Sequence, residues 1–248
     1  MAKEQAETSG KSEEAAPARR ASDRGRYGRL SRERVLSSAL DLVDREGLSA
    51  LSMRRLGAEL GVEAMALYRY ADSKDALLDG LVEALHLKLE ERLSGEEVPE
   101  AKPGPSAWRA ELHRIARATY DVCVTHPRAV PLLATRMLAV PLAQRPAAVL
   151  RDHERVLALL REAELDDAHI AAAFQAYTAW LLGYVSAELQ PMVDNPDEPD
   201  PAFRLGLHRL SAQELPTLRE TAIALTVRGG PEGLAAGLDA LLDRFTRE

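Results

Sequence analysis

The sequence predicts an all-α protein, with an N-terminal three-helix bundle followed by a larger helical domain. The 248 residues are rich in alanine, leucine, arginine and glutamate, and aromatic residues make up only 4% of them. The abundant types lose little side-chain freedom in a helix. Apolar residues also recur at helical spacing in one segment after another, and glycine or proline separates these segments. We therefore expect almost no sheet.

Residues 1–27 are expected to form a flexible arm. They are polar, rich in alanine, glutamate, serine and arginine, and show no apolar periodicity. Such a segment cannot bury enough apolar surface to offset the entropy lost on ordering.

Serine residues precede the first two predicted helices. Ser31 can cap a helix that ends before Gly47, and Ser52 can cap a short second helix. Gly61 follows that second helix and permits a left-handed stop. A third helix over 63–70 begins immediately afterwards.

Asp72 or Ser73 is expected to cap a long fourth helix. Two short helices joined by a glycine turn and backed by a first helix have the geometry of a helix-turn-helix, which we place at 28–75. Gly57 would let the short helices approach closely, although a glycine there costs the helix about 1 kcal/mol relative to alanine.

In the third helix, the side chains of Tyr68, Arg69 and Tyr70 are not needed to fill a hydrophobic core. A DNA major groove would accommodate this face. Arg54 and Lys74 lie at the starts of the second and fourth helices, where basic groups and helix N-termini both favour phosphate. Taken alone, Tyr70 is more typical of a packing aromatic. A helical hairpin that binds protein is the alternative interpretation of the segment.

The distribution of charge is compatible with such a face, although the net charge is −7. Residues 19–74 contain twelve Lys/Arg and eight Asp/Glu, whereas 76–248 contain eighteen and twenty-six. The basic part is therefore N-terminal. Five arginines in 19–29 could extend it along DNA, and the alternative for them is a solubilising tail.

Residues 31–78 resemble the DNA-binding region of the TetR family of transcriptional regulators. The resemblance lies in VLSSALDLVDREGLSALSMRRLGAELGV and ALYRYADSKDALL, and the LY-x-[HY]-x-x-x-K ending is its most diagnostic part. It implies that Tyr68 and Lys74 contact phosphates. Ala64 and Ala66 replace polar residues often found there, so methyl contacts and DNA shape would share the readout. The residues that the resemblance places at DNA are Arg54, Ala64, Met65, Ala66, Tyr68, Arg69, Tyr70 and Lys74.

Residues 76–248 are expected to be helical, with loops at 94–106 and 190–201. The resemblance is general here and implies a ligand-binding and dimerisation domain like that of the tetracycline repressor. The predicted helices are 106–125, 128–140, 146–163, 167–190, 202–209, 211–227 and 231–246.

Two stripes of small residues support a dimer interface, because small side chains let a second helix approach closely. Two such helices per subunit would form a symmetric four-helix bundle. Packing within one subunit is the alternative. The stripes are Ala172, Ala176, Ala179, Gly183 and Ala187, then Gly233, Ala236, Gly237 and Ala240.

A ligand site is implied by the resemblance alone. Its candidates are polar or aromatic residues on apolar helices, although core packing suits each one better when taken singly. They are Trp108, Tyr120, Arg136, Gln175, Tyr177, Trp180 and Tyr184. The sequence Asp152-His153-Glu154 is interpreted as a solvated helix face, and His126-Pro127 as a helix stop.

Other classes of protein find little support in the sequence. The lone Cys123 excludes a cysteine-rich zinc site, no two histidines share a helix turn, and no catalytic or nucleotide-binding motif is present. We expect no cofactor, no metal and no enzymatic activity. The uncharged stretch 168–187 is interrupted by polar residues, which argues against a membrane span. Without a signal peptide, a cytoplasmic location is expected.

Together these features predict a homodimeric regulator, a repressor that a small molecule releases from a palindromic operator in double-stranded DNA. A ligand-independent activator or a corepressor-dependent regulator would have the same sequence features. A helical protein-binding or enzymatic dimer without a DNA role is the alternative of another class.

Overall fold

The computed structural model describes residues 30–95, 107–194, 213–227 and 229–246, together with positions 197, 206, 209 and 211. Within these residues every regular element is helical and none is a strand. The prediction of an all-α fold is confirmed. The predicted arm at 1–27 and most of the predicted helix at 202–209 lie outside the described residues.

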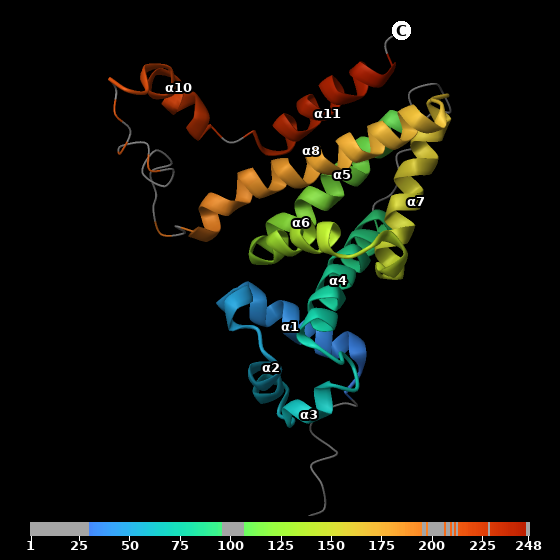
Figure 1. The fold of residues 1–248 in the computed structure, drawn as a ribbon, viewed down its shortest axis with the longest axis vertical. Helices are drawn as coiled ribbons and strands as arrows, with labels where there is room; N and C mark the ends of the chain where they lie inside the picture. The colour runs from blue at the N-terminus through green and yellow to red at the C-terminus, as the bar shows by residue number, and fades with distance from the viewer. Residues whose placement is uncertain are drawn as a thin grey trace, which may run out of the picture. The chain divides into compact units, whose positions relative to one another are not determined.

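Three helices and the start of a fourth form the N-terminal bundle, in which the first helix packs on the second and the fourth, and the second packs on the third (Figure 1). The first three are α1 (Arg32–Glu46), α2 (Met53–Leu60) and α3 (Ala64–Leu67), and the fourth is α4 (Lys74–Gly95). Large apolar side chains with less than 2% of their surface exposed fill the space between them. Burying a leucine contributes about 1.5–3 kcal/mol, so these contacts dominate the stability of the bundle. The buried leucines are Leu40, Leu42, Leu51, Leu56, Leu67 and Leu77.

Serine hydroxyls cap three of these helices. Ser31 Oγ accepts a hydrogen bond from the Arg34 amide at 3.2 Å, and Ser52 Oγ accepts one from the Arg55 amide at 3.2 Å. Ser73 Oγ accepts from the Ala76 amide at 3.0 Å and thereby caps α4. Each bond satisfies an amide that has no partner within its own helix.

The turn between α2 and α3 depends on two glycines. Gly61 adopts a left-handed conformation with φ of 67°. A Cβ at Gly57 would lie 2.9 Å from the Val62 carbonyl oxygen and 3.2 Å from the Ala64 amide nitrogen. The absence of a side chain at Gly57 therefore lets the chain after the turn pack directly on α2.

Helix α3 is shorter than predicted. It ends at Leu67, whereas the sequence suggested 63–70, and residues 68–70 form a turn in which the Tyr70 amide donates to the Leu67 carbonyl at 2.8 Å. Ala71 is buried directly after this turn and α4 begins three residues later. The chain has to reverse here, so no further helical turn fits.

Helix α4 connects the bundle to the rest of the chain. It packs against α1 and α6 (Val130–Ala139) in its first half, and further along against α5 (Ala107–Thr125) and α7 (Ala147–Glu162) (Figure 1). The predicted domain boundary between residues 75 and 76 falls within its first turn. A movement of α4 would therefore change packing contacts on both sides of that boundary.

The other α-helices among the described residues are α8 (Asp167–Asp194), α10 (Pro216–Thr226) and α11 (Gly230–Thr246). Helix α8 continues past the predicted end at 190 to Asp194 and contains Pro191. Helix α10 starts at Pro216 rather than at 211, since a proline suits the first turn of a helix. The other predicted ranges agree with the structure to within about two residues.

Helices α8 and α11 pack against each other within the subunit. A Cβ at Gly237 would lie 2.0 Å from the Trp180 ring, and one at Gly233 would lie 2.6 Å from the Tyr184 hydroxyl. That hydroxyl donates to the Gly230 carbonyl at 2.6 Å. Trp180 and Tyr184 of the same subunit thus pack against Gly237 and Gly233, respectively.

Candidate nucleic-acid interface and effector cavity

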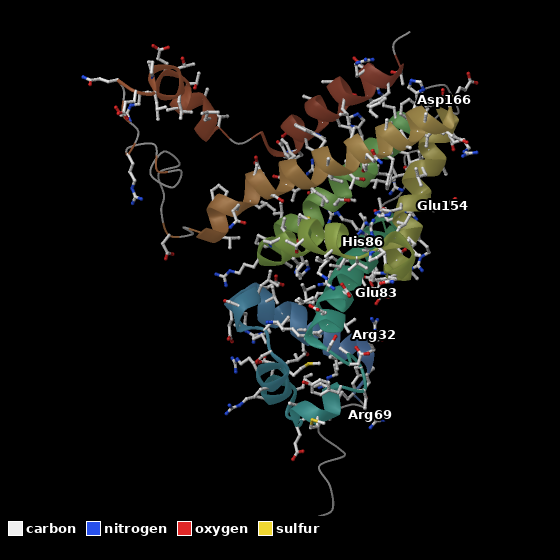
Figure 2. The ribbon with its side chains drawn as sticks, in the orientation of Figure 1. Arg32, Arg69, Glu83, His86, Glu154 and Asp166 are labelled. Carbon is white, nitrogen blue, oxygen red and sulfur yellow. The ribbon has the colours of Figure 1, made fainter. Side chains whose placement is uncertain are left out.

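The surface at α3 is exposed and partly apolar. Met65 is 73% exposed and Tyr68 is 44% exposed, and Arg69 beside them is exposed as well (Figure 2). Ala64, Ala66 and Tyr70 are half-buried. Exposed apolar side chains that are grouped on one surface, with basic residues beside them, are typical of a surface that binds a partner.

Three cations near this surface have no acidic partner in the part of the chain that the structure describes. Within the described residues, Arg54, Arg69 and Lys74 form no ion pair, and each is exposed. Neighbouring arginines do form ion pairs, and these pairs connect helices of the N-terminal bundle. Arg45 pairs with Glu59 at 2.9 Å, Arg55 with Glu46, and Arg32 with Glu83 at 2.5 Å, the last pair labelled in Figure 2.

The uncompensated cations coincide with helix N-termini. Arg54 lies in the first turn of α2, and Lys74 is the first residue of α4. A helix N-terminus presents amide groups and the positive end of the helix dipole, so it attracts anions together with a basic side chain. The surface formed by α3 and the starts of α2 and α4 thus suits a phosphate backbone on either side of a groove.

A second feature is a cavity of about 50 Å³ lined by residues of α4, α5, α6, α7 and α8. Most of its wall is apolar, and five titratable side chains from α4, α5, α7 and α8 also line it. The polar residues of the wall are His86, Thr119, Cys123, Asp152, His153, Tyr177 and Thr178, and the apolar ones are Leu85, Leu89, Val122, Leu133, Val156, Phe174, Leu181 and Leu182.

The interpretation of Asp152-His153-Glu154 as a solvated face was wrong for two of the three residues. His153 is only 6% exposed and lines the cavity, as does the half-buried Asp152, whereas Glu154 is exposed. His153 shares the buried face of α7 with Val149, Val156 and Leu160. The 3–4 residue spacing of that face was a signal from which its burial could have been predicted.

The buried polar groups of the cavity are only partly paired. His86 Nδ1 lies 3.0 Å from the Val82 carbonyl, which only accepts, so this nitrogen carries the hydrogen. His86 Nε2 lies 3.9 Å from Asp152 Oδ2. Within the described residues, Asp152 Oδ1, His153 Nδ1 and the Tyr177 hydroxyl have no hydrogen-bond partner.

Burial shifts the pKa of the cavity groups toward their uncharged forms. It raises the pKa of Asp152, against the opposing effect of His86, and it raises the pKa of Tyr177. It lowers the pKa of His153 to about 4, with Arg145 contributing in the same direction. It raises the pKa of Cys123 to about 12, so that thiol stays protonated and unreactive.

Tyr177 is the one predicted pocket residue that lines this cavity. Arg136 binds Asp79 of α4, and Gln175 is exposed. Trp180 and Tyr184 contact the glycines of α11. The two remaining candidates, Trp108 and Tyr120, are buried in α5 outside the cavity wall.

The predicted dimer residues divide into two sets. On α8, Ala172, Ala179, Gly183 and Ala187 are exposed and Ala176 is half-buried; on α11, Ala236 and Ala240 are exposed. A Cβ at Gly183 would meet nothing within 4 Å. An exposed face of small residues therefore remains on α8, whereas Trp180 and Tyr184 of the same subunit cover Gly237 and Gly233.

These observations define a class: a helical protein that carries a helix-turn-helix beside a separate domain with an internal cavity. Residues 35–81 match the family model described as "Bacterial regulatory proteins, tetR family", and residues 99–244 match "Tetracyclin repressor-like, C-terminal domain". The chain belongs to the TetR family.

Individual relatives agree with this assignment. The chain is 32% identical to the HTH-type transcriptional repressor DrrR1 of Streptomyces coeruleorubidus over 67% of its own length, and the match spans 56% of that relative. It is 27% identical to the class C tetracycline repressor protein of Escherichia coli, over 82% of this chain and 84% of the relative.

A solved structure resembles the whole described fold. It is the Streptomyces coelicolor TetR family protein ActR in complex with actinorhodin, with a TM-score of 0.67 and 25% identity. The match covers 89% of this chain and all of that one. None of the described helices combines the length and the apolar character needed to cross a bilayer.

Proposed function

We propose that this protein is a homodimeric transcriptional repressor that binds a palindromic operator and is released from it by a small molecule. The observation that carries the proposal is the set of uncompensated, exposed cations around the exposed α3 surface of a helix-turn-helix. Lys74 and Tyr68 would contact phosphates, and Arg69 with Met65 would face base edges. Ala64 and Ala66 are half-buried and offer only methyl groups, so we expect few direct hydrogen bonds to bases.

A dimer is needed to read a palindrome, because each half-site requires its own recognition helix. The two helices have to lie about 34–36 Å apart to meet successive major-groove faces. The exposed small-residue face of α8 is the surface we propose for the contact, with Ala236 and Ala240 of α11 beside it. No charged residue interrupts α8 between 168 and 187, so a second copy could bury this face at little electrostatic cost.

Release by a small molecule follows from the position of α4. The helix begins at Lys74, next to the proposed DNA surface, and its residues Leu85, His86 and Leu89 form one wall of the cavity. A ligand that binds one arrangement of α4 more tightly shifts the protein toward that arrangement. The separation of the two DNA-binding helix-turn-helix units of the dimer would change with it. The relatives support this role, since DrrR1 is named a repressor and ActR was solved with actinorhodin.

The direct test measures binding of the purified full-length protein to the DNA upstream of its own gene. We expect salt-dependent preference for a palindrome in that region over random DNA, and increased transcription of the target when the gene is deleted. Equal affinity for random DNA would overturn the DNA-binding role, and decreased transcription on deletion would contradict repression. A regulator of this kind acts in the cytoplasm, where bacterial DNA lies.

A further inference from the structure

We infer that the effector is an uncharged ring compound of the phenol class. This inference rests on the proposed function, since it concerns the small molecule that releases the repressor. Its hydroxyl group would lie between Asp152 and Tyr177, and its ring would lie against the leucines, valines and Phe174 of the wall. The chemistry follows from the buried polar atoms of the residues that line the cavity.

Three buried polar atoms around one cavity have no partner within the described residues: Asp152 Oδ1, His153 Nδ1 and the Tyr177 hydroxyl. Tyr177 is only 4% exposed and His153 only 6%. Each unsatisfied buried polar group costs about 1–3 kcal/mol, so three of them in one place indicate a site that a polar group completes.

The hydrogen-bonding capacity of these atoms selects a hydroxyl group. The Tyr177 hydroxyl offers a donor and needs an acceptor, which an ammonium lacks. The carboxyl group of Asp152 accepts when it is ionised, and a carboxylate on the ligand has no hydrogen to give it. A hydroxyl group both donates and accepts, so it satisfies Tyr177 together with either protonation state of Asp152.

The remainder of the wall selects an uncharged ring. The imidazole of His153 meets the Phe174 ring edge-on, with the ring centroids 5.1 Å apart, and leucine and valine side chains form most of the other surface. Moving a charged ligand into such a site costs much more than moving a neutral one. At about 50 Å³ the cavity is smaller than the roughly 150 Å³ that holds benzene, so ligand entry has to widen it.

Four matched probes test the inference on the full-length protein without DNA. They are 4-ethylphenol, ethylbenzene, the cation 2-phenylethylammonium and the anion 4-ethylbenzoate, each titrated by saturation-transfer NMR. We expect 4-ethylphenol to bind at least about tenfold more tightly than ethylbenzene, because only the phenol pairs the buried polar groups. Preference for the ammonium or the benzoate, equal binding of 4-ethylphenol and ethylbenzene, or no binding of any probe would overturn the inference.

Two variants identify the contacts. Tyr177→Phe removes only the hydroxyl, so we expect 4-ethylphenol to bind about three- to tenfold more weakly while ethylbenzene is unaffected. Leucine is close to aspartate in shape and lacks both of its oxygens, so Asp152→Leu should also weaken 4-ethylphenol selectively. The control is Tyr120→Phe, which removes a buried hydroxyl outside the cavity and should leave both affinities unchanged. Equal losses in all three variants would contradict the assignment.

Operator binding without probes is measured separately on the same samples. Loss of operator preference overturns the proposed function and leaves the result of the probe titration intact. Failure of the phenol preference overturns the inference about the ligand and leaves operator binding intact.

Discussion

Arg136 of α6 forms a two-pronged ion pair with Asp79 of α4, with Nε 2.7 Å from Oδ1 and Nη2 3.0 Å from Oδ2. Its third nitrogen, Nη1, lies 3.4 Å from Asp75 Oδ1, one turn closer to Lys74. The arginine side chain is 18% exposed, so the pair is shielded from solvent more than most surface pairs. It fixes α6 to the part of α4 that packs on the N-terminal bundle.

Replacement of Arg136 by methionine should lower the free energy of unfolding by about 1 to 2 kcal/mol, since it leaves Asp79 without its partner. Urea denaturation of the two proteins measures this change. Arg151→Met is the matched control, because Arg151 makes a similar two-pronged pair from α7 to Glu90 of α4 but is 56% exposed. A control that loses as much stability as Arg136→Met would argue against a special role for the α6 pair.

Replacement of Lys74 by alanine should weaken specific and non-specific DNA binding by similar factors. If Lys74 of each subunit contacts one phosphate, the slope of log K against log salt for the dimer should become shallower by about 1.8. Fluorescence anisotropy at several salt concentrations gives this slope. Lys88→Ala removes an exposed lysine farther along α4 and should leave it unchanged. An unchanged slope for Lys74→Ala would remove that residue from the phosphate contacts.

Replacement of Arg69 by alanine should relax the sequence preference at one position of each half-site. A lost base contact costs about 1–3 kcal/mol of discrimination and is confined to the base that was contacted. Selection of binding sites from a randomised operator library shows the change directly. A profile that weakens uniformly at all positions would instead identify Arg69 as a phosphate contact.

Introduction of glutamate at Gly183 should dissociate the dimer. The dyad of a symmetric dimer brings two copies of the new carboxylate into one buried face, and we expect the dimer Kd to rise by at least about 100-fold. Ala158→Glu places the same charge on an exposed small residue of α7 and serves as the control for sedimentation equilibrium. An unaffected dimer in Gly183→Glu would move the interface away from this part of α8.

The buried His153 should make stability depend on pH. Its pKa is about 4 in the folded protein and 6.5 ordinarily, so between these values the unfolded state binds more protons. The free energy of unfolding should therefore fall by up to roughly 3 kcal/mol as the pH falls from about 6.5 to about 4. The raised pKa of Asp152 acts in the opposite direction. Comparison with His153→Gln isolates the histidine, and identical pH profiles would contradict its burial as a neutral group.

Much of the fold could be predicted because helix boundaries depend on local interactions. The caps at Ser31, Ser52 and Ser73 each involve a residue and an amide three positions later. The stop at Gly61 depends on a single backbone angle. Such features are present in the sequence within one helical turn, and they predicted the helix-turn-helix and its exposed face.

The cavity is different, because residues of five helices, up to about a hundred positions apart in the sequence, line it. Of the seven residues predicted to form a ligand pocket, Tyr177 alone lies on its wall. Trp180 and Tyr184 pack instead on the glycines of α11, and Arg136 reaches α4. Residue type indicated that these side chains suit a pocket, but only the packing of the helices determines what each one contacts.

The sequence by itself determined the all-α fold, the DNA-binding unit and the face that α3 exposes, since all three depend on periodicity and spacing within about fifty residues. The tertiary structure decided which polar groups are buried together. Asp152, His153 and Tyr177 meet because α7 and α8 pack on α4 and α5, and that arrangement places uncompensated hydrogen-bonding atoms inside an apolar wall. A one-dimensional pattern carries no information on which helix will face which, and the chemistry of the effector depends on that choice.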